Sequence, residues 1–154
     1  MRQCFAGVIT AAFLIMATTF SYCASATLDI DELVDRYGAA TGVQRPKIEG
    51  ANRYKVIAAI AVIKDVLDWN TFDKASSRPG RYYKVVTEQQ ATKAGTLYRV
   101  IIYYKDEAKV KNLVKGQRIN IDGTFVKIND DIGSFSVWVF ADKLTAEDKV
   151  MLEL

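Results

Sequence analysis

Histidine is absent from this 154-residue sequence, and cysteine is nearly absent. Without histidine the chain lacks the usual general base near neutral pH, the histidine of nucleophilic triads and most zinc or copper ligand sets. Both cysteines, Cys4 and Cys23, lie within residues 1–26, so the remainder of the chain forms no internal disulfide. Gly-x-Ser-x-Gly and phosphate-binding glycine motifs are also missing. We therefore expect a protein that is not an enzyme, uses no cofactor and binds no metal.

Residues 1–26 have the features of a secretory signal peptide. Arg2 precedes an apolar stretch over residues 5–20, and Ala24-Ser25-Ala26 supplies an Ala-x-Ala cleavage site. We expect cleavage after Ala26 and a periplasmic or secreted protein. An uncleaved membrane anchor is the alternative, because the apolar stretch approaches the length that spans a bilayer. No second such stretch follows. Cleavage removes Arg2 and lowers the net charge from +3 to +2, too little for a polybasic nucleic-acid or membrane binder.

The chain after Ala26 divides into three expected segments. Residues 27–50 are expected to form an N-terminal helix and linker, residues 51–144 a β domain, and residues 145–154 a C-terminal tail or short helix. The first helix is expected over residues 28–42, where Asp29 can cap and Glu32 follows three residues later. Its apolar side chains recur at helical spacing, which predicts that the helix docks on the rest of the domain. Residues 44–50, which include Pro46, are expected to be a linker. Thr145-x-x-Asp148 predicts a helix cap in the tail.

Five strands are expected in the β domain, with one short helix between the third and the fourth. The first is a nearly continuous apolar run, although its alanines leave a buried helix as an alternative. The helix is expected over residues 106–115, capped by Asp106 and stopped by Gly116. Residues 68–79 and 89–95 are expected to be connections and residues 129–133 a turn. The strands are expected at 55–66, 82–87, 96–105, 118–128 and 135–141.

Asp122-Gly123 interrupts the fourth expected strand. An Asp-Gly pair between alternating residues is a strong hairpin signal. It also fits a bend or bulge within one long, strongly curved strand. We favour the bend, because a hairpin at this point would leave only two very short strands.

The order of three strands, one helix and two strands is that of an OB-fold. This fold is a five-stranded Greek-key β-barrel in which a helix joins strands 3 and 4. The expected fold class is therefore mainly β, an OB barrel preceded by an N-terminal helix.

Three stretches carry a resemblance to a known group. They are VKNLVKGQRINIDGTFVKI at residues 110–128, FSVWVFADKL at 135–144 and ANRYKVIAAIAVIKDV at 51–66. In that order, the three stretches resemble a strand entry, the last strand and the first strand of small exported bacterial OB-fold proteins. That group is similar to the tRNA-anticodon-binding (tRNA_anti-like) OB domains. The resemblance implies the same fold. This sequence departs from it at Ala59, where glycine is common, and at Ala141-Asp142, where a cysteine often ends the last strand.

OB-folds commonly bind ligands on the outer face of strands 2 and 3 and on the adjoining loops. Alternation along the third strand predicts that Tyr98, Val100, Ile102 and Tyr104 point inward and that Arg99 points outward. Aromatic and basic residues interleave in these segments, as stacking and backbone contacts to single-stranded nucleic acid require. The alternative is an ordinary barrel wall, because tyrosine favours strands in any sheet. The candidate ligand-binding residues are Trp69, Phe72, Arg78, Tyr82, Lys84, Arg99 and Tyr103, of which Tyr103 is also expected to face out.

Two classes of function follow from this site. One is a non-catalytic binding module for single-stranded nucleic acid or oligosaccharide, with Trp69 the first candidate to contact a sugar. The other is an interaction or adaptor protein of the cell envelope that docks another protein. Asp130 and Asp131 argue against nucleic acid, because they place two carboxylates in the loop between strands 4 and 5. We expect this loop to be a solvated turn, since a calcium site needs more oxygen ligands than it offers.

Overall fold

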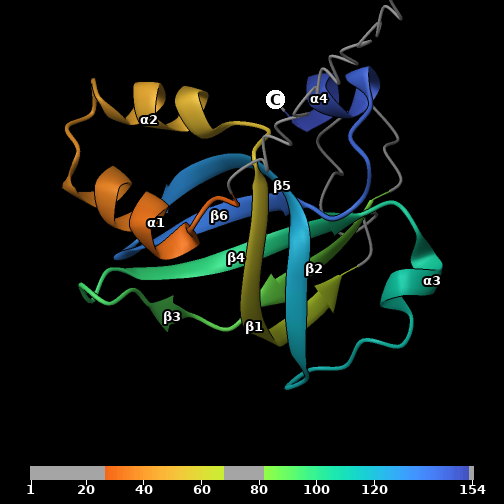
Figure 1. Cartoon of the computed structure of the whole chain (residues 1–154). Helices are drawn as coiled ribbons and strands as arrows, with labels where there is room; N and C mark the ends of the chain where they lie inside the picture. Colours follow the sequence, from red (N-terminus) through yellow and green to blue (C-terminus); the bar gives the residue numbers. More distant parts are fainter. Residues whose placement is uncertain (1–26, 68–81, 153–154) are drawn as a thin grey trace, which may run out of the picture.

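The computed structural model describes residues 27–67 and 82–152 of the chain (Figure 1). The fold is mainly β, as predicted, with a six-stranded mixed sheet and four short helices among these residues. The helices are α1 (Ile30–Ala39), α2 (Arg45–Asn52), α3 (Glu107–Val110) and α4 (Ala146–Leu152). The strands are β1 (Val56–Leu67), β2 (Tyr83–Thr87), β3 (Gln90–Ala91), β4 (Leu97–Tyr104), β5 (Arg118–Asp131) and β6 (Ser134–Phe140).

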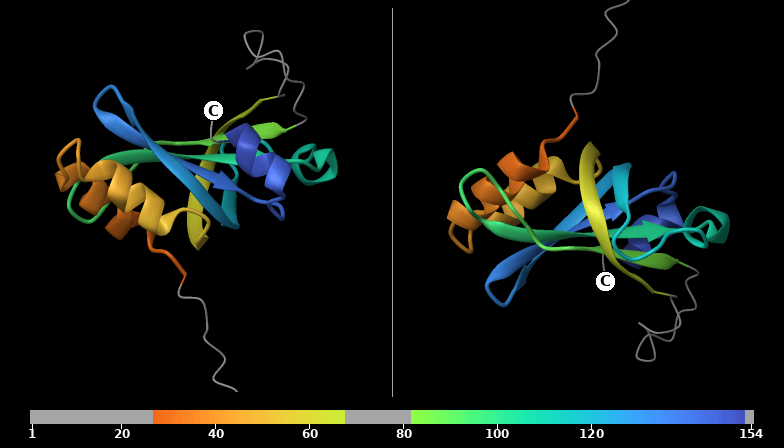
Figure 2. Two further views of the ribbon diagram at one scale, coloured as in Figure 1. Left: turned by 90° about the horizontal axis from the view of Figure 1, so that it is seen from above. Right: turned by 90° about the horizontal axis from the view of Figure 1, so that it is seen from below.

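The strands lie in the order β2-β1-β5-β6-β4-β3, and β2 also pairs with β4. The pairing of β4 with β6 is parallel, and the other strand pairings are antiparallel. Three views agree that α1 and α2 lie at one end of the sheet and α3 and α4 at the other (Figures 1 and 2).

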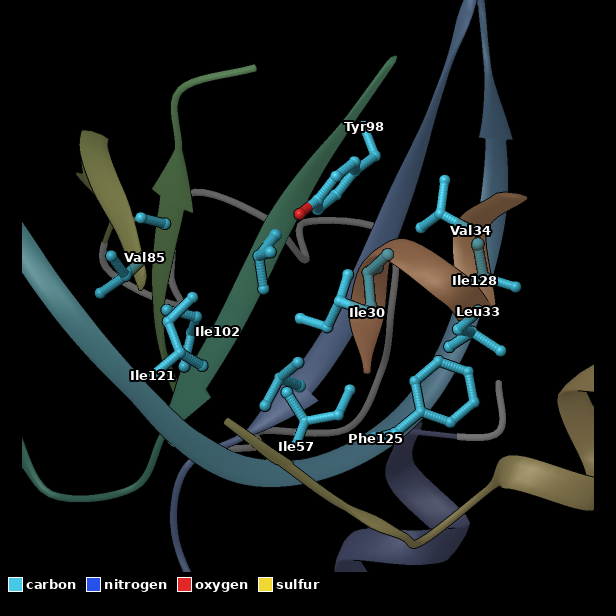
Figure 3. Close-up of a cluster of buried hydrophobic side chains, with 14 of the residues drawn as sticks. Ile30, Leu33, Val34, Ile57, Val85, Tyr98, Ile102, Ile121, Phe125 and Ile128 are labelled. Atoms are coloured by element: carbon cyan, nitrogen blue, oxygen red, sulfur yellow. The ribbon is translucent and has the colours of Figure 1, made fainter. Parts of the chain in front are cut away.

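The main core lies between the inward faces of the strands and α1. Ile57 and Phe125 are fully buried there, and α1 adds Leu33 and Val34 from its apolar face (Figure 3). The α1 helix begins where predicted, because the Asp29 carboxylate accepts hydrogen bonds from the first backbone N–H groups. The prediction that this helix docks on the β domain is confirmed.

Most of the expected elements are present, and the strand interpretation of β1 is confirmed against a buried helix. Four details were wrong. The short strand β3 lies in an expected connection, α3 is a single turn that ends at Val110, and β5 continues to Asp131 through the expected turn. The segment expected to be a linker instead forms α2. Pro46 is compatible with this helix because it occupies the first turn, where a missing N–H costs nothing. The predicted cap of α4 is confirmed, since Thr145 and Asp148 exchange hydrogen bonds.

Asp122-Gly123 lies inside β5, which runs without interruption from Arg118 to Asp131. The hairpin alternative was therefore wrong. Gly123 pairs with Ile57 of β1, and β6 passes close behind it. A Cβ atom at this position would lie 2.6 Å from the Phe140 carbonyl oxygen and 2.7 Å from a Val139 methyl group. Only glycine allows the backbones of β5 and β6 to approach this closely.

We predict that Gly123→Ala lowers the free energy of unfolding by about 1–3 kcal/mol, the usual cost of overpacking a core. Gly50→Ala is the matched control, because no atom lies within 4 Å of the Cβ that it would add in α2. That change should leave stability equal or raise it by up to about 1 kcal/mol, since alanine favours helix. Urea unfolding followed by circular dichroism measures both. Equal stabilities of the two variants would contradict the close approach.

Candidate functional site

The outer face of the sheet, which points away from the main core, brings together basic, aromatic and hydroxyl side chains. On β4, Arg99 alternates with the buried residues Tyr98 and Val100. Arg99 lies beside Ser136 in the parallel pairing of β4 with β6. We call this surface the charged face. It comprises Lys84, Arg99, Lys127, Asp131, Ser134, Ser136 and Trp138.

A β-bulge sets the position of Lys127 on the charged face. The register of β5 with β6 shifts between Phe125 and Lys127, so that Val126 is the extra residue. Phe125 belongs to the main core, whereas Val126 packs in a second cluster on the outer side. The bulge therefore turns Lys127 outward, opposite Trp138 in the pairing with β6.

The indole ring of Trp138 lies among cations. The Lys127 Nζ atom is 4.0 Å from the ring centroid and the Lys84 Nζ atom is 6.0 Å from it, both within cation–π range. The Tyr103 ring is tilted by 45° with its centroid 5.2 Å away. Burial lowers the pKa of both lysines. The carboxylates of Asp131 and Glu49 act on Lys84 and Lys127, respectively, in the opposite direction. A bound anion would offset part of this desolvation.

Three hydrogen-bond donors on the charged face are buried without a partner in the part of the chain that the structure describes. They are Arg99 Nε, Ser134 Oγ and Trp138 Nε1. The Asp131 carboxylate lies 3.7 Å from Arg99 Nε, which is too far for a hydrogen bond. Each unpaired buried donor costs about 1–3 kcal/mol. Because three lie on one face of neighbouring strands, the face is suited to a ligand that supplies acceptors.

A cavity of about 420 Å³ lies between the turn that precedes β4 and the β5–β6 hairpin. Asp130 on its rim accepts two hydrogen bonds from the Arg45 guanidinium, at 2.8 and 3.0 Å. The loop expected to be only a solvated turn therefore carries an ion pair to the first residue of α2. No group of three or more metal-ligating side chains occurs within residues 27–67 and 82–152. The cavity is lined by Gly95, Thr96, Leu97, Asp130, Asp131, Gly133, Ser134 and Phe135.

Four of the predicted ligand-binding residues lie on the outer side of the sheet, namely Tyr82, Lys84, Arg99 and Tyr103. The expected inward direction of Tyr98, Val100 and Ile102 is confirmed, since all three are buried in the main core, and Tyr104 packs against that core. Tyr103 does point to the outer side of the sheet, as expected, but its ring is not open to solvent. Tyr82 and Tyr103 are each only 5% exposed, so neither offers an open ring. Trp69, Phe72 and Arg78 lie outside the described residues.

The two tyrosines are covered because the outer side of the sheet has a second hydrophobic cluster. It contains Tyr82, Ile101, Tyr103, Val126 and Phe140, with Trp138 and Leu144 packed against it. The helix α4 is tied to the cluster through buried Asp148, which accepts a hydrogen bond from the Tyr82 hydroxyl and pairs with Lys105. Burial alone would raise the pKa of Asp148, but the hydrogen bonds from Lys105, Tyr82 and Thr145 outweigh it and lower the pKa to about 2.

Sequence reasoning missed Lys127 and Trp138 as members of the site. A signal for Trp138 exists, because alternation in FSVWVF places Ser136, Trp138 and Phe140 on one side of a strand. Lys127 carries no such signal. Without the bulge at Val126, alternation from buried Phe125 would turn Lys127 toward the core.

Comparison of the chain with models of known protein families and with curated proteins finds no match. No helix among the described residues is long and apolar enough to cross a membrane. The site is therefore interpreted from its own geometry.

We predict that Asp148→Asn lowers the free energy of unfolding at pH 7 by about 1–3 kcal/mol, the cost of losing hydrogen bonds to a charged group. The pKa of Asp148 in the folded protein is below its ordinary value of 3.8. The stabilisation is therefore complete above about pH 4 and is lost as the pH falls toward 2.

Urea unfolding at pH 7, 4 and 2.5 tests this prediction. The difference in stability between the unmodified protein and Asp148→Asn should narrow below pH 4. Glu147→Gln, at an exposed neighbouring position on α4, should show no such difference. A difference that persists unchanged at pH 2.5 would contradict the assigned role of Asp148.

Proposed function

We propose that this protein is an exported, non-catalytic OB-fold binding module whose charged face binds an acidic oligosaccharide. The observation that carries the proposal is a set of three buried donors, Arg99 Nε, Ser134 Oγ and Trp138 Nε1, that have no hydrogen-bond partner among the described residues. Export rests on the signal-like sequence of residues 1–26.

The strand pairings support the OB-fold part of the proposal. Leaving β3 aside, β1 pairs with β2 and β5, β4 pairs with β2 and β6, and β5 pairs with β6. Each of these five strands therefore has two neighbours, as in a closed barrel. The parallel pair joins the third and fifth of them, and α3 falls between the third and fourth. The same order supports the resemblance to the tRNA-anticodon-binding-like OB group.

The chemistry of the charged face favours a negatively charged ligand that is rich in acceptors. Arg99, Lys84 and Lys127 supply positive charge, and the three buried donors require oxygen acceptors. The carboxylates of an acidic sugar supply negative charge, and its carboxylate and hydroxyl oxygens supply acceptors. Trp138 offers a partly exposed ring, and flat apolar rings pack against the faces of sugars. Asp131 at one end can accept hydrogen bonds from sugar hydroxyls.

Single-stranded nucleic acid fits this face less well. Non-specific binding of single strands relies on open aromatic rings, each worth about 1–3 kcal/mol per stacked base. The rings of Tyr82 and Tyr103 are covered, so neither can stack on a base. Of these three rings only Trp138 is partly exposed, which leaves no row of rings for successive bases.

We predict that a hexamer of galacturonic acid changes the fluorescence of Trp138, measured in a Trp69→Phe background so that one tryptophan reports. Lys127→Met should weaken this binding by about tenfold, because one charge-assisted contact of roughly 1.5 kcal/mol is lost. Arg99→Lys should also weaken it, since lysine keeps the charge but lacks the Nε donor.

Lys111→Met is the matched control, because it removes the same charge at an exposed position just after α3. It should bind the acidic hexamer as the background protein does. A neutral hexamer of galactose should bind more weakly. Tighter, strongly salt-dependent binding of a thymidine oligonucleotide would replace the proposed ligand class by single-stranded nucleic acid. No fluorescence response to the galacturonic acid hexamer or to the thymidine oligonucleotide would contradict a binding role for the charged face.

A further inference from the structure

One edge of β1 is only partly paired. The backbone groups of its even-numbered residues point to the edge away from β5. Along that edge the Val56 carbonyl accepts a hydrogen bond from Leu28 N at 2.8 Å, and the Val62 carbonyl accepts one from Glu88 N at 2.7 Å. These two contacts fix the direction in which the residues between them present their N–H and C=O groups.

Ala58 and Ile60 lie between these two contacts and face an open edge. β2 pairs with β1 only from Ile63 onward, and Leu28 bridges β1 only at Ile57. The parallel bridge of Leu28 with Ile57 engages the Ala58 N–H with the Leu28 carbonyl. Within residues 27–67 and 82–152, no hydrogen bond reaches the Ala58 carbonyl or the N–H and C=O groups of Ile60 at this edge. One donor and two acceptors are thus available to another extended segment.

A cavity of about 270 Å³ lies directly beside this open edge. It is lined by residues 58–60 of β1, by the short strand β3, by residues 29–31 at the start of α1 and by Tyr98 of β4. Gln90 of β3 lines the cavity, and its Nε2 atom is buried without a hydrogen-bond partner in the described part of the chain. The edge therefore opens into a space that contains a further unsatisfied polar group.

The charge and polarity around the cavity indicate the composition of an occupant. Asp29 and Asp31 line the cavity, and no lysine or arginine within the described ranges does. Asp31 accepts a hydrogen bond from Tyr98 at 2.7 Å, which holds its carboxylate at the wall. The side chains of Ile60 and Val62 on the outer side of β1 are 51% and 38% exposed. An extended peptide alternates its side chains, so basic groups can face the carboxylates while apolar groups cover β1.

We propose that an extended, basic segment of a partner protein adds as a strand to the Ala58–Ile60 edge of β1. Its main chain pairs with the open N–H and C=O groups, and its basic side chains lie beside Asp29 and Asp31. This is recognition by strand addition, in which main-chain bonds give affinity and alternate side chains give specificity. The site is separate from the charged face and places the envelope-docking role on a defined surface.

Amide hydrogen exchange provides the most direct test, with the pentapeptide Val-Lys-Val-Lys-Val, acetylated and amidated, as the probe. In the free protein the amide of Ile60 should exchange quickly. Those of Ala59 and Ala61, which face β5, should exchange slowly and serve as internal controls. Saturating peptide should slow exchange at Ile60 by at least about tenfold, as for an amide that enters a ladder.

Variants of the probe and the protein complete the test. Asp31→Asn keeps an acceptor for Tyr98 but removes the charge, and should weaken peptide binding by about tenfold. Glu147→Gln removes one negative charge from α4 and should not weaken it. Three results would overturn the proposal: undiminished binding of both peptides N-methylated along one edge or along the other, equal binding of Val-Glu-Val-Glu-Val, or unchanged exchange at Ile60. Self-association of the chain through this edge would overturn it as well, because the occupant would then be a second copy.

Discussion

The burial of β4 on both of its faces is the constraint on which the rest of this structure depends. Four consecutive residues, Val100, Ile101, Ile102 and Tyr103, are each at most 7% exposed. One face of the strand belongs to the main core, and the other needs a cover of its own. That cover is the second cluster, to which α4 is tied through Asp148. Since the cluster occupies one end of the outer side, the charged face is confined to the polar end at Arg99.

The charged face combines features that are costly in a folded protein and useful in a binding site. Lysines that lose hydration and donors that lack acceptors both reduce the stability of the folded protein. Such destabilising groups are typical of functional sites. A ligand that brings acceptors and negative charge removes both costs at once. The side chains of the charged face are also held in fixed positions. Arg99 and Trp138 lie on paired strands, and a bulge sets the position of Lys127.

Much of the fold could be predicted from the sequence, because its signals are local. Alternation identified β4 and the inward direction of Val100 and Ile102, and Asp29 marked the start of α1. The continuity of β5 through Gly123 followed from the length of the flanking runs. The α2 helix was missed, although proline is compatible with a first helical turn and Pro46 occupies one.

The candidate site was harder to predict, because it depends on contacts between distant parts of the chain. Tyr103 has the alternation of an outward residue, and nothing near it in sequence shows that a cluster tied to α4 covers it. The outward position of Lys127 depends on one extra residue at Val126, and a shift of one position reverses every side chain. Lys84 and Arg99 were predicted correctly to share a face, because adjacent strands 2 and 3 of the expected barrel carry them.

The central claim is that the buried donors of the charged face serve a ligand. Its most direct test is a ¹⁵N NMR spectrum of the Trp69→Phe protein, recorded for the Trp138 indole and the Arg99 Nε–H group during titration with hexagalacturonate. The account predicts that both signals shift together as the donors gain acceptors, with the same saturation as the fluorescence change. Saturable binding that leaves both signals unmoved would place the ligand elsewhere and contradict the account.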